Sequence, residues 1–381
     1  MTRLVFWQNM LAFHQSAHIR ALAARGEYEV TWVAGEALSA ERKALGWSVP
    51  DAGCATVVVA PDETQMLSLI HERPEASIHI FSGLHDAPMT RRAFEHCLPT
   101  RTTLGLLSES YDHRGWKSVV RSLRSRLDAV RLGARIDFLL PMGQLGVQWF
   151  SRAGFPREKI FPYGYFTEAP VIDATDDDAV SDGGPVQLMY VGQYIQRKGV
   201  DVLLQALAGQ ESSDWHLQLV GEGDWRALLE GMSNRLGLSE RVSFLASQPN
   251  AEVMRLMQHS DLLILPSRFD GWGAVVNEAL LRGTPVVCTD KCGAADLLRE
   301  DWRGEAVPCT SVPALSEALR RRIAQGRLTP EGRARIREWA RCITGEMAAD
   351  YLHQIIQYVI GNAPRPTPPW YATTNEAVRS Q

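Results

Sequence analysis

The chain has 381 residues, of which 45% are hydrophobic and 22% are charged, so it can bury a sizeable core. This composition excludes a mainly disordered chain and fits two domains, or one large one. Lysine and arginine total 40 against 44 aspartate and glutamate residues, which gives a formal net charge of −4. This balance does not support binding to nucleic acid through bulk charge, and we expect no nucleic-acid partner.

The cysteines and the N-terminal residues indicate a reducing compartment. The six cysteines are irregularly spaced, and Cys288 and Cys292 lack the second cysteine or histidine pair that would complete a zinc site. We expect them to be small buried side chains, with a disulfide framework as the alternative. We find neither a signal-peptide pattern nor a run of about 18 apolar residues that would span a membrane. We therefore expect a cytoplasmic location.

Short apolar runs alternate with longer amphipathic stretches along the first half of the chain. A helix is predicted after the first strand, over residues 16–24. The predicted strands lie at residues 4–7, 30–33, 55–60, 77–81, 102–107 and 138–140. This alternation is typical of a doubly wound parallel sheet.

The same alternation begins again in the second half. The predicted strands lie at residues 186–191, 216–220, 242–245, 262–265 and 285–288. The predicted helices lie at residues 199–207, 225–236, 251–258 and 274–282. The sequence therefore predicts an α/β protein with two Rossmann-like, doubly wound domains.

An acidic segment separates the two series. Residues 167–185 contain five aspartates, end in Gly-Gly-Pro and lack apolar periodicity, so they are predicted to be a linker. A surface loop inside one domain is the alternative. The predicted domains are residues 1–166 and 186–344. A helical pattern at residues 345–361 precedes a proline-rich tail at 362–381.

The most informative stretch follows the predicted strand at 262–265. It carries Asp270 in a loop, Gly271 and Gly273 around a tryptophan, and Glu278 on the helix that follows. Glycine lets the backbone approach a ligand closely, because no Cβ intervenes. The start of a helix offers free N–H groups to phosphate, and ligands of open α/β sheets bind at the carboxyl ends of strands. This segment is therefore the best candidate for a phosphate and sugar site.

This stretch resembles the donor site of family 4 of the retaining GT-B glycosyltransferases. The family signature is a carboxylate, a Gly-aromatic-Gly loop and a glutamate eight residues after the carboxylate. The first carboxylate is usually glutamate in the family and is Asp270 here. The resemblance implies that Asp270 contacts hydroxyl groups of the donor sugar and that Glu278 holds the ribose hydroxyls. It also implies that the sugar and diphosphate accept hydrogen bonds from the backbone N–H groups of Gly271, Trp272, Gly273 and Ala274.

Further segments follow in the order that the family has. The remaining donor-binding residues implied by the resemblance are Gly192, Gln193, Arg197, Lys198, Gly221 and Gln248. Lys198 would neutralise the diphosphate and stabilise the leaving group. Gln193 stands where the family usually has an arginine, and Arg197 is the nearby candidate to replace that charge. The Gly221 turn lacks the third glycine of a dinucleotide fingerprint, which argues against NAD binding.

The first half carries the residues expected at the acceptor, because the first domain receives the acceptor in this fold. Asn9 and His14 follow the first predicted strand, and His85 and Asp86 follow the fourth. Glu109 follows the fifth strand, where many members of the family have a histidine. We predict that Glu109 orients or deprotonates the acceptor hydroxyl, with a surface salt bridge as the alternative. For His14, the alternative is a helix residue that faces water.

Residues 116–135 form a basic amphipathic stretch. Trp116, Val119, Val120, Leu123, Leu127, Val130 and Ala134 recur at helical spacing. Lys117, Arg121, Arg124, Arg126, Arg131 and Arg135 stand against a single acid, Asp128. Such a helix can lie on an anionic membrane. The alternative is a packed helix with a solvated basic face.

The resemblance implies two Rossmann-like domains that face each other across a cleft, with the helix at 345–361 completing the first. It implies transfer of a hexose from a UDP- or GDP-linked sugar to a saccharide or lipid-linked acceptor, with retained anomeric configuration. The predicted catalytic residues are Lys198, Asp270 and Glu109, with no metal and no other cofactor. Cell-surface polysaccharide or glycolipid synthesis at the inner face of the cytoplasmic membrane is the expected setting. The alternatives are a nucleotide-sugar epimerase on the same scaffold and a non-catalytic nucleotide-sugar-binding protein.

Overall fold

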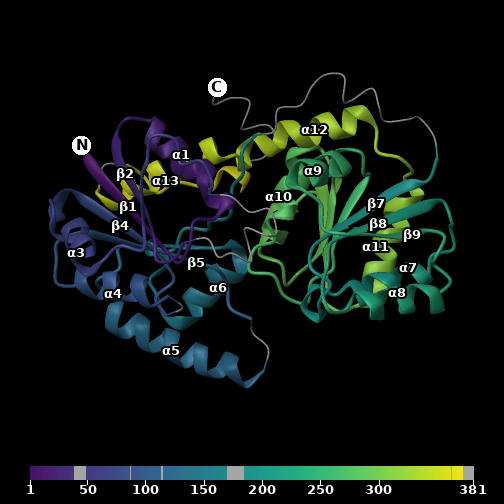
Figure 1. Cartoon of the computed structure of the whole chain (residues 1–381), viewed down its shortest axis with the longest axis horizontal. Coiled ribbons are helices and arrows are strands. Elements are labelled where there is room, and N and C mark those ends of the chain that lie inside the picture. The colour runs from purple at the N-terminus through teal and green to yellow at the C-terminus, as the bar shows by residue number, and fades with distance from the viewer. Residues whose placement is uncertain (38–48, 86, 113–114, 170–183, 362, 372–381) are drawn as a thin grey trace. The chain divides into compact units, whose positions relative to one another are not determined.

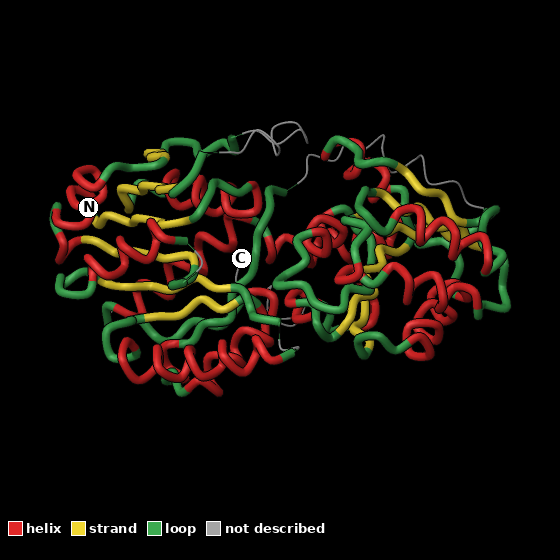
Figure 2. The backbone as a smooth tube through the Cα atoms, turned by 60° about the horizontal axis from the view of Figure 1, so that its bottom comes forward, coloured by secondary structure: helices red, strands yellow, loops and turns green. Residues whose placement is uncertain are grey.

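The computed structural model forms two compact units, Met1–Glu168 with Cys342–Gln381, and Ala169–Arg341. Each unit contains a parallel sheet with helices on both of its faces (Figures 1 and 2). The structure describes residues 1–37, 49–85, 87–112, 115–169, 184–361 and 363–371. Most of the predicted linker at 167–185 and most of the tail at 362–381 lie outside the described residues.

The first unit is built on a parallel sheet with the strand order β3-β2-β1-β4-β5-β6. The strands are β1 (Thr2–Gln8), β2 (Tyr28–Ala34), β3 (Thr56–Val59), β4 (Ser77–Ser82), β5 (Thr103–Ser108) and β6 (Phe138–Pro141). Every predicted strand of this half is present, and all of them are largely buried except the edge strand β3, whose side chains are mostly exposed. The chain order reverses between β1 and β4, and such a switch point opens a crevice at the carboxyl edge of a sheet.

Helices cover both faces of this sheet (Figure 1). They are α1 (Phe13–Ala24), α3 (Glu63–His71), α4 (Pro88–Cys97), α5 (Trp116–Leu132), α6 (Gly143–Ala153) and α13 (Gly345–Val359). The C-terminal helix α13 packs on α1, where a Cβ at Gly345 would lie 2.5 Å from the Cβ of Ala17. Gly345 also donates its N–H to the carbonyl of Thr167 at 3.0 Å. The last long helix of the chain therefore belongs to the first unit.

The core of the first unit includes a buried tryptophan–histidine pair. The indole Nε1 of Trp7 donates to Nδ1 of His79 at 2.9 Å, and both side chains are fully buried. Burial lowers the pKa of His79 to about 3, so the ring stays neutral and accepts this hydrogen bond. His79 is thus a structural residue within β4.

The second unit has its own sheet, with the order β12-β11-β10-β7-β8-β9. The strands are β7 (Val186–Val191), β8 (Trp215–Val220), β9 (Val242–Leu245), β10 (Leu262–Leu265), β11 (Val286–Thr289) and β12 (Gly304–Val307). The helices are α7 (Val200–Ala208), α8 (Arg226–Arg235), α9 (Asn250–Gln258), α10 (Val275–Leu281), α11 (Val312–Ala324) and α12 (Pro330–Ala340). The predicted α/β class with two Rossmann-like parallel sheets is confirmed in both units.

Candidate active site

The predicted donor segments of the second unit meet at the carboxyl edge of its sheet. Strands β7 and β10 are neighbours, and the chain order reverses between them. The loop after β7 and the loop after β10 are therefore brought into contact, although 72 residues separate the contacting side chains. This reversal is the place where open α/β sheets bind their ligands.

Lys198 and Asp270 form an ion pair at this edge. The Lys198 Nζ donates to Asp270 Oδ2 at 2.6 Å, and the two side chains are 15% and 13% exposed. The Arg197 Nη1 lies 4.0 Å from the same carboxylate oxygen and donates to the carbonyl of Phe269 at 3.0 Å. Two cations thus converge on one carboxylate, which leaves one positive charge for a ligand anion.

A second ion pair joins the loop after β10 to the first turn of α7. Arg268 donates from Nη1 and Nη2 to the two carboxylate oxygens of Asp201, each at 2.7 Å. This bidentate geometry fixes the orientation of both side chains. Sequence reasoning did not single out these residues, although an arginine two positions before Asp270 and an aspartate three positions after Lys198 were available signals.

The loop that carries Asp270 is held by the segment after β11. The Asp270 N–H donates to the carbonyl of Lys291 at 2.9 Å, and the Gly293 N–H donates to the carbonyl of Asp270 at 3.1 Å. Gly273 has a φ of +93°, and a Cβ there would lie 2.8 Å from the Sγ of Cys292. The site therefore needs glycine at position 273 for both its conformation and its space.

Trp272, which the resemblance places at the donor, has its side chain in the core. It is 1% exposed, and its Nε1 donates to Oδ1 of Asn277 at 2.7 Å. The indole is therefore a core side chain that does not contact a ligand. The nearby Cys288 and Cys292 are free and buried, which agrees with their expected role as small core residues.

Glu278 lies on α10, and its side chain is half-buried. Within the described ranges, no hydrogen bond or ion pair reaches its side chain, and desolvation raises its pKa to about 7. A desolvated carboxylate without hydrogen bonds is costly unless a ligand supplies donors. Glu278 is thus poised to accept hydrogen bonds from a ligand.

The remaining donor candidates line the turns after β7, β8 and β9. Gly192 and Gly221 have φ values of +155° and +153°. Gln193 has an exposed side chain, while its carbonyl accepts the hydroxyl of Tyr190 at 2.9 Å. Gln248 is half-buried and donates from Nε2 to the carbonyl of Ala246 at 3.1 Å. The Gln248 amide is thus engaged by its own loop, while the exposed Gln193 amide is accessible to solvent.

We expect Gly221→Ala to lower the free energy of unfolding by roughly 2–4 kcal/mol, because a Cβ there would lie 1.9 Å from the carbonyl oxygen of Gly192. Gly237→Ala is the matched control, since Gly237 has a φ of +69° and no atom lies within 4 Å of its added Cβ. The control is expected to cost only about 1 kcal/mol in urea unfolding. Equal losses in the two variants would contradict the steric account.

The acceptor candidates of the first unit fall into two groups, and the first contains His14 and Glu109. The Tyr165 hydroxyl donates to the carboxylate of Glu109, and the Tyr165 ring lies 3.8 Å from the His14 ring, centroid to centroid. Burial lowers the pKa of His14 to about 4, so this ring is neutral at pH 7 and does not simply face water. Tyr165 was not predicted as a site residue, because only the fold brings it beside Glu109.

The second group surrounds His85. Its Nε2 lies 2.8 Å from Oδ2 of Asp128 on α5, so the structure places His85 against α5. A small pocket of about 370 Å³, part of it open to solvent, is lined here by His85, Ser108, Tyr111, Arg121 and Asp128, among others.

Two further acceptor candidates lie outside both groups. Asn9 is exposed, and its carbonyl accepts the N–H of Glu36 at 2.9 Å. Asp86 lies outside the described residues. Across the described part of the chain, no cluster of three or more His, Cys, Asp or Glu side chains is arranged to hold a metal ion.

The two parallel sheets and their carboxyl-edge sites define the fold of the GT-B glycosyltransferases. The crystal structure of Anabaena HepE in complex with UDP superposes with a TM-score of 0.71 at 17% identity, and covers 94% of this chain and 100% of that one. The apo lipopolysaccharide outer core galactosyltransferase WaaB also gives a TM-score of 0.71, at 15% identity, and covers 93% and 99%.

The sequence match falls on the second unit. Residues 171–341 match the family model described as glycosyl transferases group 1, and this stretch is therefore a domain of that family. The amylovoran biosynthesis glycosyltransferase AmsK of Erwinia amylovora is 26% identical over 207 residues, which cover 52% of this chain and 50% of AmsK. The chain spans half the length, or less, of the first curated relatives that it matches.

Proposed function

We propose that this protein is a retaining, metal-independent glycosyltransferase of family 4. It moves a hexose from a UDP- or GDP-linked sugar to a saccharide or lipid-linked acceptor, in cell-surface polysaccharide or glycolipid synthesis. The observation that supports this most is the Lys198–Asp270 pair beside the desolvated carboxylate of Glu278, in the segment that matches the family model. The name of AmsK and the UDP bound to HepE are consistent with such a reaction.

The donor lies along the carboxyl edge of the second sheet in this proposal. Lys198 and Arg197 neutralise the diphosphate. Lys198 is mostly buried, and a charge interaction is stronger there than in water. Asp270 keeps Lys198 oriented and accepts hydrogen bonds from hydroxyls of the sugar. Glu278 accepts hydrogen bonds from the ribose hydroxyls, which supplies partners for its half-buried carboxylate.

The chemical step is a front-face substitution at the anomeric carbon. The acceptor oxygen bonds to this carbon on the face from which the diphosphate oxygen departs, so the configuration is retained. The acceptor proton passes to an oxygen of the leaving diphosphate. The negative charge that develops there is stabilised by Lys198 and Arg197.

The acceptor hydroxyl is oriented by Glu109, which the hydrogen bond from Tyr165 holds in place. We expect Glu109→Gln to lower kcat for transfer by roughly tenfold to hundredfold, with the Kd for nucleotide unchanged. The measurement is transfer kinetics beside nucleotide titration. Glu95→Gln is a matched control, because Glu95 is an exposed glutamate that pairs with Arg91 within α4. Unchanged kcat in Glu109→Gln would remove this residue from the reaction.

A thermal-shift screen with UDP, GDP and ADP tests the donor assignment. A ligand that binds only the folded state raises the unfolding temperature. At a concentration of one hundred times its Kd, it adds about 2.7 kcal/mol to the free energy of unfolding. We expect stabilisation by UDP or GDP and its loss in Glu278→Ala. Stabilisation by none of the three nucleotides would contradict the proposal.

Turnover distinguishes the two alternatives. An epimerase would change the free nucleotide sugar without releasing a nucleoside diphosphate. A non-catalytic binding protein would bind the nucleotide sugar with no turnover on any acceptor. The proposed enzyme releases the nucleoside diphosphate in the cytoplasm, at the inner face of the membrane.

A further inference from the structure

Helix α5 has the reverse of the usual amphipathic arrangement. Its inward face centres on Ser125, which is buried and accepts the Nε1 hydrogen of Trp149 at 3.1 Å, and only Ala129 and Leu132 of this helix are apolar side chains that pack on the core. Its outward face is apolar, and the exposed fractions of its side chains range from 53% at Val120 to 84% at Val130. The outward apolar residues are Trp116, Val119, Val120, Leu123, Leu127 and Val130. The alternative of a helix that packs its apolar stripe on the core is therefore wrong.

These outward side chains form one continuous stripe. Apart from the adjacent Val119 and Val120, they follow one another at intervals of three or four residues, which places all six on one side of the helix, opposite Ser125. The helix has 17 residues and is therefore about 25 Å long. Six large apolar side chains exposed along one helix exceed the scattered single residues that a free surface normally shows.

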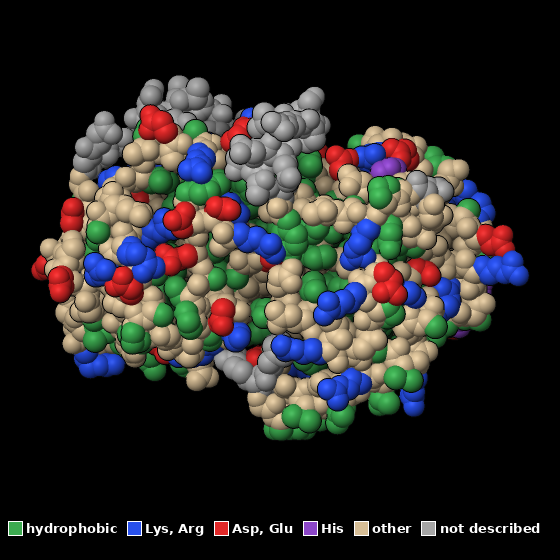
Figure 3. Space-filling view, turned by 180° about the vertical axis from the view of Figure 1, so that it is seen from behind, with side chains coloured by type: hydrophobic (Ala, Val, Ile, Leu, Met, Phe, Trp, Pro, Cys, Tyr) green, Lys and Arg blue, Asp and Glu red, His purple; other side chains and the backbone are tan. Residues whose placement is uncertain are grey.

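Basic residues border the stripe. Lys117, Arg124 and Arg131 are spaced by seven residues, so they lie along one edge of the stripe, and Arg126 lies along the other. Figure 3 shows green and blue side chains together along the lower edge of the molecule, where α5 lies in Figure 1. The single acid of the helix, Asp128, faces inward and pairs with His85. The outward surface is therefore apolar and cationic.

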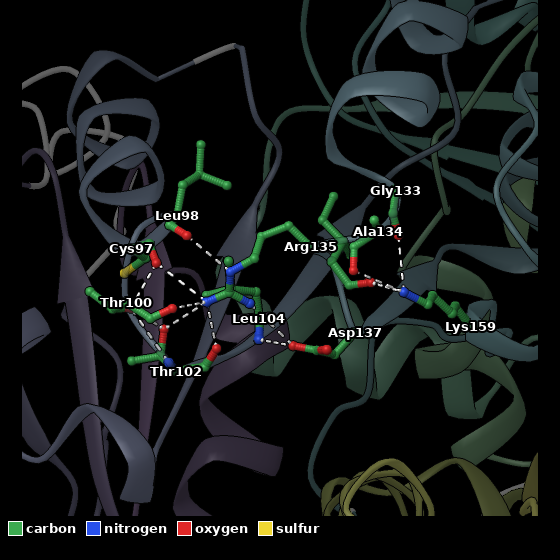
Figure 4. Close-up of polar contacts among 11 residues, drawn as sticks. Cys97, Leu98, Thr100, Thr102, Leu104, Gly133, Ala134, Arg135, Asp137 and Lys159 are labelled. Atoms are coloured by element: carbon green, nitrogen blue, oxygen red, sulfur yellow. Dashed lines mark hydrogen bonds and ion pairs between the residues drawn. The ribbon is translucent and has the colours of Figure 1, made fainter.

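The end of α5 is fixed firmly to the first unit (Figure 4). Lys159 donates from Nζ to the carbonyls of Gly133 and Ile136, at 3.0 and 2.7 Å. Arg135 donates to the carbonyl of Thr102 at 2.7 Å and to those of Leu98 and Thr100. The prediction that Arg135 belongs to the basic face is thus wrong, because its guanidinium is engaged by the main chain beyond the helix. The apolar stripe is held outward by these contacts.

We propose that α5 docks this protein on an anionic lipid surface, with the helix axis parallel to the membrane plane. The apolar stripe enters the boundary between headgroups and acyl chains, while Lys117, Arg124 and Arg131 meet lipid phosphates. Charge complementarity favours this occupant over a second copy of the chain, because two copies would bring like charges together. In the described part of the chain, no helix combines the length and apolar character needed to cross a membrane.

Vesicle binding of the full chain tests this docking surface. The probe is phosphatidylcholine vesicles with about 30% phosphatidylglycerol, compared with phosphatidylcholine alone, in a co-sedimentation assay. We expect binding to the anionic vesicles that weakens with salt, because screening shortens the reach of the arginine charges. Leu123→Gln with Leu127→Gln, and separately Arg124→Gln with Arg131→Gln, should each lower the partition coefficient by roughly tenfold or more.

Matched control variants distinguish an effect of α5 from an effect of losing positive charge or an exposed leucine elsewhere on the surface. Leu228→Gln alters an exposed leucine on α8, and Arg152→Gln with Arg235→Gln removes the same charge from two other exposed positions. These variants should bind vesicles as the wild type does. All substituted side chains are exposed, so thermal unfolding should remain unchanged.

Three results would overturn the docking surface. The first is equal binding to neutral and anionic vesicles, and the second is unchanged vesicle binding in both α5 variants. The third is a wild-type dimer in sedimentation that binds no vesicles and that dissociates in the Leu123→Gln, Leu127→Gln variant. The last result would make α5 an interface between copies of this chain. Since no sugar donor is used, failure of this test leaves the transferase proposal standing.

Discussion

We expect Lys198→Ala to lower kcat for glycosyl transfer by roughly 100- to 1000-fold. The Lys198 ammonium lies 2.6 Å from Asp270, where it is desolvated, and removal of one such preorganised charge from a leaving group costs about this much. The effect should fall on kcat more than on KM, because the charge on the diphosphate grows as the bond to the sugar breaks. Steady-state kinetics of nucleoside diphosphate release measures both constants.

Two companion variants make this result specific. Lys291→Ala removes a more exposed lysine of the same unit, which pairs with Asp290 at 3.4 Å, and it should leave kcat unchanged. Lys198→Arg keeps the charge but changes its shape, and it should recover part of the activity. A Lys198→Ala enzyme that is folded and as active as the Lys291→Ala enzyme would contradict the role of Lys198.

The second large effect concerns Glu278 and depends on pH. A hydrogen bond to a charged group contributes about 1.5–3 kcal/mol, so loss of the ionised carboxylate should raise the Kd for UDP or GDP by roughly 10- to 100-fold. Because desolvation raises the pKa of Glu278 to about 7, nucleotide binding by the wild type should weaken as the pH falls below about 7. Calorimetric titration between pH 5.5 and about 8.5 measures this dependence.

Glu278→Gln supplies the control for that pH profile. Its Kd should be high and should lack the transition near pH 7. If the wild type and Glu278→Gln show the same pH profile, the transition belongs to another group and the assignment of Glu278 is wrong.

The same carboxyl group should also shape the stability of the protein without ligand. Its pKa is raised from the ordinary 4.5 to about 7, so the folded state holds the proton more tightly than the unfolded state. This tighter proton binding adds to the free energy of unfolding. The contribution is complete below pH 4.5 and is lost as the pH rises through about 7. We expect Glu278→Gln to be more stable than the wild type by about 1–3 kcal/mol at pH 8 in urea unfolding, and a less stable variant would argue against the desolvation.

The strands and the donor loop were predictable because local patterns determine them. Apolar runs such as 188–191 and 262–265 are typical of strands buried on both faces, and the structure confirms a strand at each of them. The glycines around Trp272 could be recognised because close backbone approach requires glycine at Gly273. The sequence order of these pieces then indicated which loops share an edge of the sheet.

The long-range contacts were not predictable in the same way. The Arg268–Asp201 pair and the contact of Tyr165 with Glu109 depend on which strands become neighbours, and no local pattern encodes this. For α5, periodicity showed an apolar stripe but not the direction that it faces. That direction depends on distant partners such as Trp149 and Lys159, which hold the polar side and the end of the helix.

Turnover of a nucleotide-sugar panel, followed by NMR, tests the central proposal most directly. The full chain is incubated with UDP- and GDP-hexoses and a saccharide acceptor, and the product and the nucleotide are identified together. The proposal predicts release of the nucleoside diphosphate, a new glycosidic bond with the anomeric configuration of the donor, and loss of both in Lys198→Ala. An inverted linkage, or a changed nucleotide sugar with no diphosphate released, would contradict it.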